Sequence, residues 1–187
     1  MITSSDFEKL NSKDPKIKYG FTKELIKTGA ESPALLYGLF NHLTPLLKNQ
    51  NNIIKWTGID LIGYLSAIDR DKKTDKYIPA LIKFLHEGRL ITCNHSIFAL
   101  GLIAKNKPVH KSKIIRELLL ITNDTFETSE CKNIATGKVL ETLKHFIEDI
   151  KEDKAVINFI KKATSNRRNS TKKKAGQLLN KIKKSVR

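Results

Sequence analysis

Apolar residues recur along this chain at intervals of three and four positions, which is the spacing of amphipathic helices. Ile17, Phe21 and Leu25 fall on one helical face, and no Asn-Gly or Asp-Gly pair separates alternating runs. The pattern predicts an all-α protein of about ten helices. The predicted helices cover residues 4–11, 14–29, 33–48, 53–68, 74–88, 89–104, 111–121, 130–151, 154–163 and 171–186.

Prolines mark several of the predicted boundaries. Asp14-Pro15 and Ser32-Pro33 each place a capping side chain before a proline at the first helical position. Pro45 is expected to kink the helix 33–48, and Asn106-Lys107-Pro108 is expected to end the helix 89–104. The turns between helices are short, so neighbouring helices are expected to pack antiparallel.

Alternate helices share a pattern. Residues 60–65 (DLIGYL) align with 98–103 (FALGLI), 138–143 (KVLETL) and 174–179 (KAGQLL), at offsets of 38, 40 and 36 residues. The second position is small or apolar, and the sixth is Leu or Ile. A period of this length with two helices per unit resembles HEAT repeats. The resemblance implies a right-handed α-α superhelix of about four helix pairs, preceded by N-terminal helices.

The chain departs from the HEAT pattern in one respect. Many HEAT units carry an Asp at the turn between their helices and an Arg early in the second helix. Asp60 lies inside its predicted helix, and no matching Arg recurs, so a closed helical bundle is the alternative architecture. The absence of a polar face over residues 97–104 favours a stack, because such a helix must be covered on several sides.

The expected organisation is one domain over residues 1–187. Residues 1–31 form the N-terminal helices, residues 32–151 the central repeats and residues 152–187 a basic capping repeat. The last helix supports this division, because Ala175, Leu178 and Ile182 share one side and lysines occupy the opposite side. A terminal repeat needs one buried and one solvated side.

Charge is concentrated in the capping repeat. The net charge of the chain is +16, and residues 151–187 contain thirteen Lys or Arg and two acidic residues. One interpretation is a solvated helix face; the other is a surface that binds nucleic acid or an acidic partner. No aromatic residue lies within its densest part, residues 165–174, so phosphate contact is expected there rather than base stacking. The candidate binding residues are Arg167, Arg168, Lys172, Lys173, Lys174, Lys181 and Lys184.

Trp56 and Asp60 form a second candidate site. They are four residues apart and share a helical face. The pair resembles the aromatic residue and carboxylate of DNA alkylation-repair glycosylases built from HEAT-like repeats. That resemblance implies a cleft in which the carboxylate stabilises positive charge on the sugar of a departing base. Tyr64, another four residues on, is a possible companion. The alternative is a packed tryptophan and an aspartate that has a structural partner.

The remaining motifs exclude several kinds of site. No two of the five histidines have metal-binding helical spacing, and no Gly-rich phosphate loop follows a strand. Cys93 and Cys131 are one period apart, too far for a disulfide between stacked helices, so structural thiols are expected. We therefore expect no cofactor and no metal.

The expected function is binding without catalysis. A protein partner on the concave surface is the first hypothesis, and nucleic acid on the basic C-terminal patch is the alternative. The N-terminus lacks the pattern of a secretory signal, and no apolar run is long enough to span a bilayer. A cytoplasmic location is therefore expected.

Overall fold

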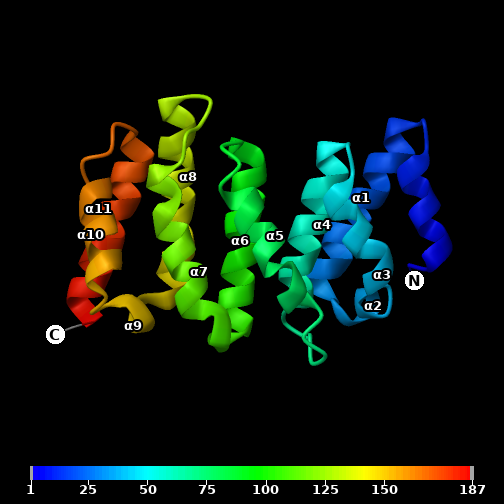
Figure 1. The fold of residues 1–187 in the computed structure, drawn as a ribbon, viewed down its shortest axis with the longest axis horizontal. Coiled ribbons are helices and arrows are strands. Elements are labelled where there is room, and N and C mark those ends of the chain that lie inside the picture. Colours follow the sequence, from blue (N-terminus) through cyan, green and yellow to red (C-terminus); the bar gives the residue numbers. More distant parts are fainter. Residues whose placement is uncertain (1, 186–187) are drawn as a thin grey trace.

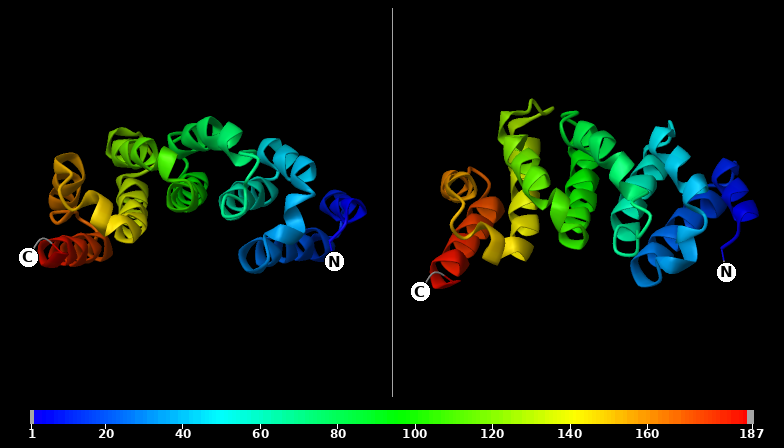
Figure 2. Two further views of the ribbon diagram at one scale, coloured as in Figure 1. Left: turned by 90° about the horizontal axis from the view of Figure 1, so that it is seen from below. Right: turned by 60° about the horizontal axis from the view of Figure 1, so that its bottom comes forward.

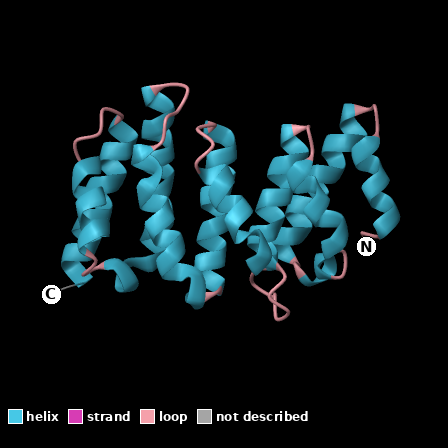
Figure 3. Ribbon diagram, viewed as in Figure 1, coloured by secondary structure: helices cyan, strands magenta, loops and turns pink. Residues whose placement is uncertain are grey.

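The computed structural model describes residues 2–185, and its regular secondary structure is helical throughout that range (Figure 3). The chain begins with η1 (Ser4–Asn11) and α1 (Pro15–Glu31). As predicted, Asp14 caps α1, since its side chain accepts a hydrogen bond from the Lys16 backbone N–H, and Pro15 is the first helical residue.

The rest of the chain forms helix pairs, each with an outer and an inner member (Figure 1). The outer members are α2 (Ala34–Tyr37) with α3 (Phe40–Leu43) and η2 (Thr44–Lys48), η3 (Thr74–Tyr77) with α5 (Ile78–Leu85), α7 (Pro108–Leu120) with η4 (Ile121–Asn123), and α10 (Lys154–Ala163). The inner members are α4 (Asn52–Leu65), α6 (Leu90–Asn106), α8 (Ser129–Leu143) and α11 (Asn169–Ser185). Two short elements, η5 (Lys144–Phe146) and α9 (Ile147–Ile150), connect α8 to α10.

The pairs stack into an open, curved array. Helices α1, α4, α6, α8 and α11 each pack against the next and form the inner layer. Figure 2 shows this layer on the hollow side of an arc, with α1 and α11 at its two ends. The array confirms the predicted α-α superhelix of four helix pairs with N-terminal helices, and it excludes the closed bundle.

The core lies between the two layers and between successive inner helices. Leu61, Ile97, Leu100 and Val139 are fully buried there. On α11, Ala175, Leu178 and Ile182 are buried while Lys172 and Lys173 are exposed, so one side of this helix packs against the array and the other is solvated. Val186, the predicted end of this helix, lies outside the described residues.

Two predicted long helices are broken. Residues 33–48 form α2, α3 and η2 instead of one kinked helix. The break follows Gly38, which disfavours a helix interior, and Pro45 begins the 3-10 turn because its ring cannot continue an α-helix. Residues 130–151 break at Phe146, where the backbone leaves the helical region (φ −125°, ψ 22°). The break allows the side chains of both Phe146 and Ile150 to be buried.

A second correction concerns Pro108. The helix predicted to end before Asn106 includes that residue, and the next helix begins at Pro108 rather than at Lys111. Proline is compatible with this position because the first helical N–H has no partner within the helix. The proline therefore separates α6 from α7 and starts the second of them.

A buried aspartate joins successive repeats at the turn after α4. Asp69 accepts hydrogen bonds from Tyr37 Oη (2.7 Å), Thr74 Oγ1 (2.5 Å) and Lys107 Nζ (2.6 Å). Burial would raise the pKa of Asp69, but these donors outweigh it and hold the pKa well below its ordinary value. Lys107 also pairs with Asp75. Asp69, rather than Asp60, is therefore the aspartate at the turn between repeats.

Candidate binding surface of the inner layer

Trp56 and Asp60 both contact α6 from the exposed side of α4. The Trp56 ring stacks on the His95 ring, with centroids 5.4 Å apart and an interplanar angle of 8°. Trp56 Nε1 donates a hydrogen bond to Thr92 Oγ1 (3.0 Å). Asp60 Oδ1 and His95 Nδ1 are 2.8 Å apart. The two candidate residues are therefore joined through His95, which lies in the next repeat.

The environment of Asp60 disfavours its charged form. Burial raises the pKa of this carboxyl, and the hydrogen bond and charge of His95 only partly oppose the effect. The side chain of Asp60 is 14% exposed and that of His95 is 31% exposed. The structural partner that the sequence left open for Asp60 is thus a histidine 35 residues away.

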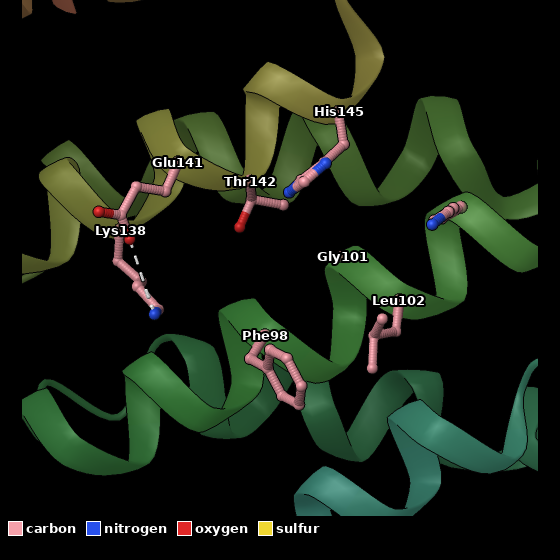
Figure 4. Close-up of a pocket in the computed structure, with 8 residues that line it drawn as sticks. Phe98, Gly101, Leu102, Lys138, Glu141, Thr142 and His145 are labelled. Atoms are coloured by element: carbon pink, nitrogen blue, oxygen red, sulfur yellow. Dashed lines mark ion pairs between the residues drawn. The ribbon is translucent and has the colours of Figure 1, made fainter. Parts of the chain in front are cut away.

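Three cavities follow one another along the inner layer. The first lies between α1 and α4 and reaches Trp56, Asp60 and His95. The second shares Asp60 and His95 with the first and extends to Phe98. The third lies between α6 and α8 and shares Phe98 with the second (Figure 4). Neighbouring cavities thus share lining residues, and the row of three from α1 to α8 is called here the inner groove.

Aromatic side chains form one part of this groove. Tyr64 and Phe98 contact each other edge to face, with ring centroids 5.4 Å apart. Both are half-buried, as is Trp56. This arrangement explains why residues 97–104 have no polar face: Phe98, Gly101 and Leu102 line a cavity instead of a fully solvated surface.

Basic side chains dominate the charged positions of the inner layer. The cavities between its helices, including a further one between η5 and α11, are lined by two acidic side chains, Asp60 and Glu141. Both acids have cationic or histidine partners, since Glu141 pairs with Lys174 (2.6 Å) and Asp60 contacts His95. The lysines that line these cavities are Lys23, Lys27, Lys105, Lys138, Lys144, Lys181 and Lys184.

Several acidic residues elsewhere have basic partners. On the outer side, Lys111 pairs with Asp149 (2.8 Å) and Arg116 with Asp153 (3.0 Å). His86 Nδ1 lies 2.7 Å from Asp124 Oδ2 at the end of α5. Among the seven lysines that line the inner cavities, Lys138 alone has an acidic side chain of residues 2–185 within ion-pair distance, that of Glu141.

The structure divides the predicted C-terminal patch into two groups. Arg167, Lys172 and Lys173 are exposed at the turn before α11 and in its first turn, while Arg168 pairs with Glu130 on α8. Lys181 and Lys184 line the cavity against η5, and Lys174 faces α8. Only the second group adjoins the cavities of the inner layer.

Sequence reasoning missed several residues of the inner groove. His95, Lys105, Lys138 and His145 were not singled out as binding residues. The alignment of the repeats contained a signal for this surface. Asp60 aligns with Phe98, Lys138 and Lys174, and all four residues lie on helices of the inner layer. Fold geometry was needed to show that this position faces the groove.

Three other features were sought in residues 2–185: a metal site, a reactive thiol and a membrane-spanning helix. No cluster of three or more His, Cys, Asp or Glu side chains could hold a metal ion within that range. Both cysteines are free thiols, and burial raises the pKa of Cys93 to about 12, which keeps it protonated and unreactive. Every helix in the same range is too short or too polar to cross a bilayer.

Comparisons with known proteins agree with this architecture. No family model and no curated protein matches the chain. An engineered protein solved by the Northeast Structural Genomics Consortium is similar in structure over 96% of this chain and 78% of its own, with a TM-score of 0.58 and 17% identity. A designed armadillo repeat protein, YIII(Dq)4CqI, aligns over 95% of this chain and 98% of its own, with a TM-score of 0.41 and 13% identity. The stacked helix pairs and the likeness to the engineered protein show a HEAT/armadillo-like helical repeat fold.

Proposed function

We propose that this protein is a non-enzymatic binding scaffold whose inner groove binds the phosphate backbone of a nucleic acid. The carrying observation is the charge of the cavity linings. The outer cavity beside α7 is lined by two cations and two acids that pair with one another, whereas the inner cavities are lined by seven lysines and two partnered acids. An extended concave surface is the usual binding surface of a solenoid.

The charge pattern favours nucleic acid over a protein of ordinary composition. Duplex DNA carries about one negative charge per 1.7 Å of its axis, a density that few protein surfaces reach. Lys105 on α6 and Lys138 on α8 line the inner groove, and Lys181 on α11 lines the next cavity of the inner layer. The protein is therefore still proposed to be a binding scaffold, but its proposed partner is a polyanion instead of an ordinary protein.

Three variants with the same net charge test this proposal. The inner variant replaces Lys105, Lys138 and Lys181 with Gln. The outer variant replaces Lys83, Lys113 and Lys161, which are exposed on α5, α7 and α10, with Gln. The end variant replaces Arg167, Lys172 and Lys173 with Gln. Binding of a labelled oligonucleotide is measured by fluorescence anisotropy from low to physiological salt.

The inner variant is expected to lose affinity at every salt concentration, and its slope of log K against log salt is expected to fall by about 2–3. The outer variant should stay within about twofold of the parent. If the end variant alone loses binding, the site is the C-terminal patch. An equal loss in all three would show attraction to net charge without a site.

Two controls separate the alternatives. Polyglutamate of matched charge should compete poorly; equal competition would assign the groove to an acidic polypeptide. Absence of binding to any nucleic acid at low salt would reject the proposal. Release of a free base from alkylated DNA, lost in Asp60→Asn, would show the enzyme that the Trp56–Asp60 pair resembles and contradict a non-catalytic role.

A further inference from the structure

We infer that the inner groove binds single-stranded nucleic acid, and that one unpaired base enters the cavity between α6 and α8. This inference rests on the proposed function and deepens it. The observation that carries it is the placement of half-buried aromatic rings beside the lysines of the same groove. Sequence alone had separated the two, since the basic cluster of residues 167–174 contains no aromatic residue.

The cavity between α6 and α8 has an apolar side and a charged rim. Figure 4 shows Phe98 and Leu102 on α6 across the cavity from Lys138 and Thr142 on α8 and His145 on η5. Gly101 keeps the base of the cavity open and close to α8, since a Cβ there would lie 2.7 Å from the Thr142 methyl group. A flat, apolar group with an attached anion fits this arrangement.

The size of the cavity indicates that it holds one group of a longer ligand and not a whole small molecule. Its volume is about 220 Å³, below the roughly 300–1,000 Å³ of sites that enclose a whole small molecule. It also shares Phe98 and Lys138 with the cavity at Asp60 and Tyr64, so a chain can extend along the groove from this cavity toward α4. A nucleotide within a strand has both properties.

Single strands are favoured over duplexes because of what the groove can contact. In a duplex the faces of the bases are stacked on one another and cannot meet Phe98, so only phosphates would be bound. In a single strand each base has a free face for an aromatic ring, and the contact tolerates any sequence. Lys105 and Lys138, at the rim of the cavity, are placed to pair with the adjoining phosphates.

The test uses the full chain and three probes of equal length, about 15 nucleotides: oligo-dT, an abasic single strand and a duplex. At matched salt, oligo-dT is expected to bind at least tenfold more tightly than the abasic strand, which has phosphates but no bases. Trp56 is the single tryptophan and lies in the groove, so its fluorescence should also change with oligo-dT.

Phe98→Leu tests the cavity itself. We expect about a 5- to 150-fold loss of affinity for oligo-dT, with the abasic strand and duplex affected less than twofold. Phe84→Leu is the matched control, because Phe84 is half-buried on α5 in the outer layer. Melting curves monitored by circular dichroism verify that both variants fold.

The comparison among probes with the unmodified protein decides the inference even if Phe98→Leu does not fold. Equal binding of oligo-dT and the abasic strand, or tighter binding of the duplex, would overturn the single-strand inference and leave the proposed function intact. Failure of all three probes to bind would instead reject the proposed function.

Discussion

Single glycines determine how closely the inner helices approach one another. A Cβ on Gly63 would lie 2.8 Å from Ala99 Cα, and a Cβ on Gly29 would lie 2.7 Å from a methyl group of Leu61. At Gly63 the obstacle is backbone, which cannot rotate away. The contact recurs between successive inner helices, so the curvature of the groove depends on residues that have no side chain.

Gly63→Ala is therefore expected to destabilise the protein by about 1–3 kcal/mol, because α4 and α6 must separate to accept one methyl group. The midpoint of urea unfolding measures the change. Gly20→Ala on α1 is the control, since no atom lies within 4 Å of the new Cβ. That variant should gain up to about 1 kcal/mol from helix propensity, and a loss of stability in it would remove the packing explanation.

Lys107 links three segments, the turn after α4, the η3 helix and the junction of α6 with α7. Its ammonium group contacts Asp69 (2.6 Å) and also pairs with Asp75, which in turn lies 2.9 Å from His110 Nε2. The side chains of Lys107 and Asp69 are 10% and 0% exposed. The connection therefore differs from the exposed ion pairs of the outer layer.

Replacing Lys107 with Met leaves the Asp69 carboxylate buried without its cation, and we expect a loss of about 3 kcal/mol in the free energy of unfolding. The comparison is Lys111→Met, which breaks a pair with the more exposed Asp149 and should cost about 0–1 kcal/mol. Chemical denaturation of both variants measures the difference. Similar losses in the two variants would show that burial does not increase the contribution of the Lys107–Asp69 pair to the free energy of unfolding.

The same turn predicts acid sensitivity. The pKa values of Asp69 and Asp75 are held below their ordinary value because the bonds from Lys107, Thr74 and His110 outweigh the effect of burial. A depressed pKa contributes stability above the unfolded pKa of about 3.9, and the contribution is lost as pH falls through the folded values. Stability should thus decline below about pH 4.

Asp69→Asn should flatten this decline, while Asp60→Asn should act in the opposite direction. Burial raises the pKa of Asp60, so its contribution is present at low pH and is lost as pH rises through the folded value. Unfolding curves at several pH values between about 2 and 6 distinguish the two. A parallel change in both variants would contradict the assigned directions.

The molecule as a whole is a one-dimensional stack, in which each repeat contacts only its neighbours. Helix α6 has inner-layer neighbours on both sides and buries Ile97, Leu100 and Ile103 completely. Helix α11 ends the layer and has one such neighbour, α8. Stability is therefore expected to differ along the array.

Amide hydrogen exchange should reveal this gradient. Protection is expected to be greatest in α6, intermediate in α4 and α8, and least in η1 and α11, because terminal repeats open without disturbing the centre. Mass spectrometry of peptic fragments provides the measurement under native conditions. Uniform protection across all helices would indicate a single cooperative unit and contradict the repeat description.

Sequence patterns predicted most of the fold and part of the candidate surface. Proline caps and apolar spacing predicted the helices. The break at Phe146 was missed because it depends on the burial of Phe146 and Ile150 in the assembled array, and the break at Gly38 was missed although glycine disfavours a helix interior. Trp56 and Asp60 were placed correctly on one helical face. Their partner His95 was not, because no local rule connects residues 35 apart.

By itself, the sequence determined that the chain is helical, that its helices repeat and that the last helix has one apolar side, since these follow from spacing within a few turns. Only the tertiary structure decided which charges share a surface. Stacking places residues about 38 positions apart on neighbouring helices, so Phe98 meets Lys138 and Lys105 in one groove. Stacking also pairs Lys111 with Asp149 and Arg116 with Asp153 on the outer side, because these residues lie about one repeat apart.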